Sequence, residues 1–128
     1  DQETMCRIYE KILLDLGVAK VSTATVAANG IRKYMTDWPE AVLLDVKMPG
    51  REGPDILREI REIDPDANVV MLSSVSERET VIKCLRNGAR NYLLKTEEPG
   101  EVKKRLPGVF RKLDLQRRRL FQTRRRSA

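Results

Sequence analysis

The most informative stretch of the sequence is residues 41–53, which read AVLLDVKMPGREG. Its first four residues form an unbroken apolar run, which is typical of a strand buried on both faces of a parallel sheet. The run ends on a carboxylate, Asp45, and a loop that contains Pro and Gly follows at residues 48–54. A helical pattern then covers residues 55–63 and ends at Asp64-Pro65, because the residue before a proline avoids helical geometry. The stretch predicts a buried strand, a loop and a helix, in that order.

Two further apolar runs follow the same plan. Residues 68–72, NVVML, are followed by Ser73, and residues 92–94, YLL, are followed by Lys95. Helical patterns occupy residues 4–16, 27–38, 55–63 and 76–87, residues 18–23 are a short β-prone segment, and a helix-prone stretch after Gly100 is interrupted by Pro107-Gly108. Residues 76–79 have the Ser-x-x-Glu spacing of a capping box. Strands that alternate with helices predict an α/β fold with a parallel sheet.

Length and composition exclude several classes of protein. The chain has 128 residues, which suits one domain, and it has no His and only two Cys, Cys6 and Cys84. A zinc finger, a Ser-His-Asp triad and a Cys-His dyad are therefore excluded, and two isolated thiols are typical of a reducing compartment. No apolar run approaches the roughly 20 residues of a membrane helix, so we expect a cytoplasmic protein without a membrane partner.

The net charge of +6 conceals two regions of opposite sign. Residues 103–128 contain eleven Lys and Arg against one acid, Asp114, a net charge of +10 that leaves −4 for the rest of the chain. We interpret residues 1–106 as one domain and residues 107–128 as a basic helical tail or linker. Three interpretations of the tail stay open: a continuation of the preceding helix, kinked at Pro107, that serves as a linker or homodimerisation helix; a solvated run of charge; and a nucleic-acid contact through its arginines.

The polar residues that follow the three strands are candidates for a functional site. The carboxyl ends of parallel strands lie at one edge of a sheet, where open α/β folds bind their ligands. Asp45, Ser73 and Lys95 would therefore bring a carboxylate, a hydroxyl and an ammonium group together. The alternative is that these strands end on polar residues only because the chain reaches water there.

Three motifs, in order, resemble those of response-regulator receiver domains of two-component signalling. They are residues 43–53, LLDVKMPGREG, residues 70–74, VMLSS, and residues 88–95, GARNYLLK. The resemblance covers the chain from Asp1 to about residue 106. It implies a doubly wound parallel sheet of five strands in the order 2-1-3-4-5, with helices on both faces.

The resemblance also implies that the first strand of this fold is not in the sequence. Alignment through the first helix makes Asp1 the second of two acids that end that strand in the family. The strand would lie between residues 18–23 and residues 41–45, which both lose a row of backbone hydrogen bonds without it. We consider three explanations and favour the first: the chain is a fragment of a longer protein, another chain or the tail supplies the strand, or the acid site is impaired.

The resemblance implies a chemical role for several residues. Asp45 is expected to be the phosphoacceptor, a carboxylate that attacks phosphorus and forms an acyl phosphate. Mg²⁺ is expected to bind Asp45, Asp1 and the backbone carbonyl of Lys47, because oxygen ligands suit that ion. Lys95 is expected to pair with a phosphoryl oxygen.

Ser73 and Tyr92 are the expected switch residues. Ser73 would donate a hydrogen bond to the phosphoryl group and draw its loop inward, and Tyr92 would change rotamer and reshape the surface of the fourth helix, fifth strand and fifth helix. The resemblance therefore predicts a signalling switch that receives a phosphoryl group from a histidine kinase and controls an output domain or effector protein. It is not expected to be a metabolic enzyme, although it assists its own phosphorylation and dephosphorylation. The alternative is a receiver-like scaffold that works through protein contacts without phosphorylation.

Overall fold

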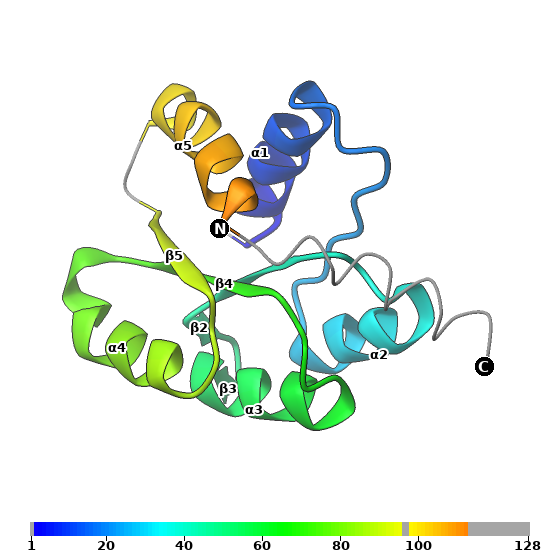
Figure 1. The fold of residues 1–128 in the computed structure, drawn as a ribbon, viewed down its shortest axis with the longest axis vertical. Helices are drawn as coiled ribbons and strands as arrows, with labels where there is room; N and C mark the ends of the chain where they lie inside the picture. The colour runs from blue at the N-terminus through cyan, green and yellow to red at the C-terminus, as the bar shows by residue number, and fades with distance from the viewer. Residues whose placement is uncertain (1, 96–97, 113–128) are drawn as a thin grey trace.

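A parallel sheet of three strands lies between two layers of helices (Figure 1). The structure is a computed structural model, and it describes residues 2–95 and 98–112. The strands are β1 (Val42–Asp45), β4 (Val69–Ser73) and β5 (Asn91–Leu94), in the spatial order β1-β4-β5. Both ladders are parallel, so the three carboxyl ends lie at the same edge of the sheet. This order reproduces the 3-4-5 half of the expected sheet and confirms the α/β fold class.

The helices of the described residues divide between the two faces of the sheet (Figure 1). They are α1 (Gln2–Asp15), α2 (Ala27–Asp37), α3 (Gly53–Ile63), α4 (Arg78–Arg86) and α5 (Pro99–Arg111). α1 and α5 cover one face, and α2, α3 and α4 cover the other. None of these helices combines the length and the apolar character needed to cross a membrane.

The strand β4 separates the two halves of the hydrophobic core. All five of its residues are buried, as its unbroken apolar run predicts. Val70 and Leu72 pack against side chains of α1 and α5, whereas Val69 and Met71 pack against those of α2, α3 and α4. Because successive side chains of a strand point to opposite faces, one short apolar run supplies both cores.

The predicted loop after β1 contains a small hairpin. Its strands are β2 (Lys47–Met48) and β3 (Arg51–Glu52), paired antiparallel. Pro49 and Gly50 connect them, and Gly50 has a φ of 76°. Proline followed by a glycine with positive φ is the arrangement of a type II turn, so this dipeptide reverses the chain just before α3.

The expected strand at residues 18–23 is not formed. These residues have an irregular backbone, and the described sheet has three strands rather than five. Among the described residues, the main chain of residues 19–25 makes few hydrogen bonds. The Thr23 carbonyl oxygen accepts one from the ammonium of Lys33, and the Ala24 carbonyl oxygen accepts one from the Cys6 thiol at 4.0 Å. A strand exists only when a neighbour pairs with it, and no strand among the described residues pairs with residues 18–23.

The expected capping box at Ser76 and Glu79 is wrong by two residues. β4 ends at Ser73, and the reciprocal pair is formed by Ser74 and Glu77 around a 3₁₀ turn, η1 (Val75–Glu77), that leads directly into α4. Ser74 is the first residue free of the sheet, so its side chain caps the turn.

The expected interruption at Pro107-Gly108 is also wrong. α5 continues through Pro107 to Arg111, although proline lacks the N–H of a helical hydrogen bond. Leu106 and Val109 are buried on the two sides of this proline, within the core shared with α1, and their packing keeps the helix continuous. The division of the chain at residues 106 and 107 therefore falls inside a helix, and it stays a prediction.

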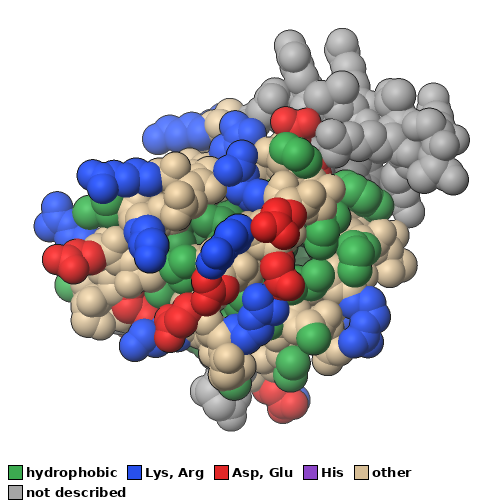
Figure 2. All heavy atoms as spheres, turned by 90° about the horizontal axis from the view of Figure 1, so that it is seen from below, with side chains coloured by type: hydrophobic (Ala, Val, Ile, Leu, Met, Phe, Trp, Pro, Cys, Tyr) green, Lys and Arg blue, Asp and Glu red, His purple; other side chains and the backbone are tan. Residues whose placement is uncertain are grey.

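The basic tail lies mostly beyond the residues that the structure describes. Residues 113–128 are outside the described part, and so are most of the arginines expected to contact nucleic acid or a second protomer. Figure 2 shows the face covered by α2, α3 and α4, on which Lys and Arg side chains are interspersed with Asp and Glu. The described residues on this face form no surface of a single charge, and the nucleic-acid hypothesis concerns the arginines of the tail.

Candidate functional site

Asp45 occupies the carboxyl end of β1, where its carboxylate is largely shielded from water. It pairs with Leu72 of β4, and its side chain is 10% exposed. Its Oδ1 accepts hydrogen bonds from the ammonium of Lys95 at 2.9 Å and from the main-chain N–H of Lys47 at 3.0 Å. Oδ2 makes no hydrogen bond within the described residues.

Lys95 reaches Asp45 across the end of the middle strand. It follows β5, and its main-chain N–H donates to the carbonyl oxygen of Ser73 at 2.8 Å. Two strand spacings separate β5 from β1, about 10 Å in a regular sheet, and the long stem of a lysine bridges this distance to form the ion pair. The predicted meeting of the carboxylate and the ammonium is therefore observed, and partial burial protects the pair from screening by salt.

The residues after Asp45 are fixed by a close contact between β1 and α3. Val46 is fully buried, its N–H donates to the carbonyl of Leu72 at 2.9 Å, and its own carbonyl accepts from Gly53 at 2.6 Å. A Cβ on Gly53 would lie 2.7 Å from the carbonyl oxygen of Val46. Only glycine allows α3 to begin this close to the strand. The sequence contains this glycine within its first motif, but periodicity and composition gave no reason to assign it a role.

Ser73 lies beside the ion pair without joining it. It is the last residue of β4 and is 1% exposed. Within the described residues its hydroxyl makes no hydrogen bond to Asp45. Tyr92 of β5, the other expected switch residue, pairs with Met71 and has a side chain that is 39% exposed. The structure places both residues on the strands next to the site, and their roles stay predictions.

The expected Mg²⁺ ligands are described only in part. Asp1 lies outside the described residues. Asp45 and the backbone of Lys47 are adjacent, and their oxygen atoms have the chemistry that Mg²⁺ prefers. No group of three or more acid, His or Cys side chains in the described part could hold a metal ion. Mg²⁺ usually keeps several waters and binds one or two carboxylates plus phosphate oxygens, so a sparse oxygen site is compatible with it.

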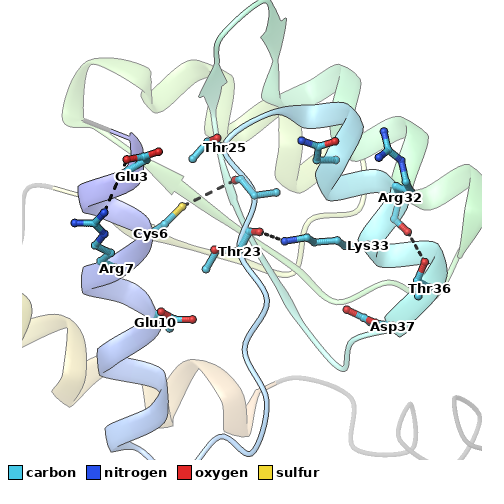
Figure 3. A pocket seen from close by; sticks show the side chains of 12 residues that line it. Glu3, Cys6, Arg7, Glu10, Thr23, Thr25, Arg32, Lys33, Thr36 and Asp37 are labelled. Atoms are coloured by element: carbon cyan, nitrogen blue, oxygen red, sulfur yellow. Dashed lines mark hydrogen bonds and ion pairs between the residues drawn. The ribbon is translucent and has the colours of Figure 1, made fainter.

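A cleft of about 580 Å³ lies elsewhere, between α1, residues 23–25 and α2 (Figure 3). Its acidic side chains are Glu3, Glu10 and Asp37, and its basic side chains are Arg7, Arg32 and Lys33. The charges balance, so the cleft attracts neither anions nor cations. Cys6 also lines it, and burial, followed by the charge of Glu10, raises the pKa of this thiol. The cleft therefore has no feature that selects a ligand, and the arrangement around Asp45 is the stronger candidate.

Comparisons with known proteins agree with the geometry. A family model described as the response regulator receiver domain matches residues 1–107. The chain is 28% identical to chemotaxis protein CheY of Thermotoga maritima, over 80% of this chain and 85% of that protein. It is 32% identical to the transcriptional regulatory protein KdpE of Staphylococcus aureus, over 78% of this chain but only 43% of that protein. A structure of the CheX–CheY–BeF₃–Mg²⁺ complex from Borrelia burgdorferi is similar with a TM-score of 0.74 and 28% identity, covering 84% of this chain and 81% of that one.

Proposed function

The chain belongs to the response regulator receiver domain family, and we propose that it is a signalling switch that accepts a phosphoryl group on Asp45. The phosphoryl donor is a histidine kinase, and the acceptor protein acts in the cytoplasm. The observation that carries the proposal is the 2.9 Å contact between the Asp45 carboxylate and the Lys95 ammonium at the carboxyl edge of the sheet. This contact supports the proposal, because a carboxylate can act as a nucleophile and an ammonium can stabilise phosphoryl oxygens.

The proposed transfer makes Asp45 the nucleophile. Oδ2, which makes no hydrogen bond among the described residues, forms the new P–O bond. The P–N bond of the phosphorylated kinase histidine breaks, its electron pair stays on the imidazole nitrogen, and that nitrogen takes a proton from water. Lys95 keeps its ammonium beside the phosphoryl oxygens, and the Lys47 N–H holds Oδ1 in place. Electrostatic positioning of this kind is the main protein contribution to phosphoryl transfer.

Mg²⁺ fits the oxygen atoms of this site. Asp45 and the carbonyl of Lys47 would hold it, together with Asp1 as the sequence predicts. The bound ion would neutralise part of the charge on the transferring phosphoryl group. Asp45 otherwise carries its negative charge next to an incoming dianion, so a cation in addition to Lys95 lowers the repulsion between them.

The output is proposed to be a change of the surface formed by α4, β5 and α5. This region exposes apolar side chains that a partner could cover: Val75, Ile82, Leu85 and Tyr92. Movement of Ser73 toward the phosphoryl group would be transmitted along β4 and η1 to this surface. The partner is an output domain of the same protein or a separate effector, as the larger size of KdpE illustrates for one relative. The protein is not a metabolic enzyme in this proposal, and it assists only its own phosphorylation and dephosphorylation.

A scaffold that works without phosphorylation is the competing function. Both functions use the same exposed surface, so only the chemistry of Asp45 separates them.

The test is incubation with acetyl phosphate and Mg²⁺ followed by a phosphate-affinity gel. The wild-type protein should shift, and Asp45→Asn, which keeps the shape of the side chain but removes its charge, should not. An established receiver domain provides the positive control. Equal mobility of wild type and variant, when the control shifts, would overturn the switch and leave the scaffold. For the tail, binding to nonspecific DNA in a salt series, with and without residues 107–128, tests the predicted nucleic-acid contact.

A further inference from the structure

The loop that follows β4 is closed by a reciprocal capping box. The main-chain N–H of Ser74 donates to Oε1 of Glu77 at 2.7 Å, and the Ser74 side chain accepts from the main-chain N–H of Glu77. Ser74 Oγ also lies 2.9 Å from the Oγ of Ser76. Glu77 is only 8% exposed, so its carboxylate bonds in a poorly solvated environment. A hydrogen bond to a charged group in such a place is among the strongest that a loop can contain.

This box fixes the peptide group that joins Ser73 to Ser74. On one side, the carbonyl oxygen of Ser73 accepts from the N–H of Lys95 at 2.8 Å. On the other side, the N–H of Ser74 donates to Glu77. The peptide plane directly after the predicted switch hydroxyl is therefore held at both ends. The bond to Lys95 extends the β4–β5 ladder, whereas the bond to Glu77 belongs to the short turn η1.

The remainder of the turn supplies little other restraint. Val75 is 70% exposed although it is apolar, and Ser76 is also exposed. The side chains of Val75 and Ser76 are therefore not buried against the described part of the chain. On the inner side, the turn is held by the Glu77 carboxylate and by the main-chain hydrogen bond from Glu77 N–H to the carbonyl oxygen of Ser74 at 3.1 Å.

We propose that Glu77 is a positioning residue that holds the turn after β4 in its resting conformation and opposes the movement of Ser73 toward a phosphoryl group on Asp45. The inference rests on the proposed function and adds a regulatory element to it. The capping box and the phosphoryl group compete for the same segment: engagement of Ser73 shifts the peptide that Glu77 holds. The strength of the capping box then sets how readily the protein responds to phosphorylation.

The experiment measures binding of beryllium fluoride with Mg²⁺, a mimic of the phosphoryl group, by titration calorimetry. Glu77→Ala removes the charged acceptor and should tighten binding by about tenfold or more, the effect of losing one charge-assisted hydrogen bond from the competing state. Glu77→Gln keeps the shape of the capping box without its charge and should tighten binding to a smaller extent. In the protein without ligand, the Ser74 amide should exchange its hydrogen faster in both variants.

Tyr34→Phe is the matched control. It removes another hydrogen bond to a buried carboxylate, the 2.7 Å bond from the Tyr34 hydroxyl to Oδ2 of Asp64, between α2 and the end of α3. This variant should lose stability in urea without binding the mimic more tightly. The comparison separates an effect on the turn after β4 from a general loosening of the fold.

The outcomes distinguish this inference from the proposed function. If wild type binds the mimic and both Glu77 variants bind it equally or more weakly, the positioning role is overturned while the switch stands. If wild type neither binds the mimic nor shifts with acetyl phosphate, the proposed function fails and takes the inference with it. If Glu77→Ala does not fold, Glu77→Gln decides on the same criteria.

Discussion

Replacement of Gly53 by alanine tests the geometry beneath the site. A Cβ at Gly53 would lie 2.7 Å from the carbonyl oxygen of Val46, 2.8 Å from the Cα of Val46 and 3.0 Å from the carbonyl oxygen of Asp45. All three atoms belong to the backbone, so none can rotate away as a flexible side chain would. Gly53→Ala must therefore move the start of α3 away from β1 and strain the 2.6 Å hydrogen bond from Gly53 to Val46.

We expect Gly53→Ala to lower the free energy of unfolding by about 2 kcal/mol. Forcing a methyl group into a packed region costs about 1–3 kcal/mol, and weakening the hydrogen bond costs about 1 kcal/mol. The better helix propensity of alanine returns up to about 1 kcal/mol. Urea denaturation followed by circular dichroism measures the loss: with a slope of about 2 kcal/mol per molar, the midpoint should fall by about 1 M.

Gly100→Ala is the matched control. Gly100 lies in the first turn of α5, and a Cβ there would meet no atom within 4 Å. This substitution should leave the midpoint unchanged or raise the stability by about 0.4–1 kcal/mol, because alanine reduces the freedom of the unfolded chain. A Gly53→Ala protein that unfolds at the wild-type urea concentration would refute the close approach of α3 to β1.

Three further predictions concern buried or shielded groups. Tyr34→Phe should lower the unfolding free energy by about 2 kcal/mol in urea, because the buried carboxylate of Asp64 loses a donor; an unchanged midpoint would contradict that bond. Burial raises the pKa of both Cys6 and Cys84, so the native protein contains less thiolate at a given pH than the unfolded protein. Iodoacetamide at pH 8 should therefore label the native protein more slowly, and equal labelling rates would contradict the raised pKa values. Lys95→Met, which keeps the stem but removes the ammonium, should slow labelling by acetyl phosphate at least about tenfold in a gel time course, since one charged contact is lost; wild-type kinetics would remove Lys95 from the proposed chemistry.

Sequence reasoning predicted the part of the fold that depends on burial alone. The three apolar runs became β1, β4 and β5, and the helices flanking them follow the apolar periodicity. The expected burial on both faces holds for β4, whereas β5 buries only Leu93 and exposes Tyr92. The meeting of Asp45 and Lys95 followed from one further rule, that parallel strands end at a common edge. A lysine stem is long enough to cross the intermediate strand, so small errors in strand boundaries did not affect this contact.

Other features depended on boundaries or partners that a pattern does not contain. Residues 18–23 are β-prone, but β-propensity describes fit to a neighbouring strand and not a preference of the isolated backbone. The capping box moved from Ser76 to Ser74 because the end of β4 determines which serine is free to cap. The helix continues across Pro107 because the packing of its buried neighbours, Leu106 and Val109, outweighs the missing hydrogen bond.

The position of Asp45 is supported from sides that do not involve the outer edge of β1. The main-chain N–H groups of Val42 and Val46 donate hydrogen bonds toward β4, at 2.9 Å each. Because successive residues of a strand face opposite neighbours, the main-chain groups of Asp45 face the other edge of β1. That edge has no partner strand among the described residues. The carboxylate is nevertheless held by Lys95 and by the Lys47 N–H, and the backbone after it is held by Gly53. These contacts arise from β4, β5 and α3 rather than from a neighbour on the open side. The Asp45 carboxylate should therefore keep its geometry whether or not another strand pairs with β1. Residues 18–25, which make few such contacts among the described residues, should form a strand only when one does.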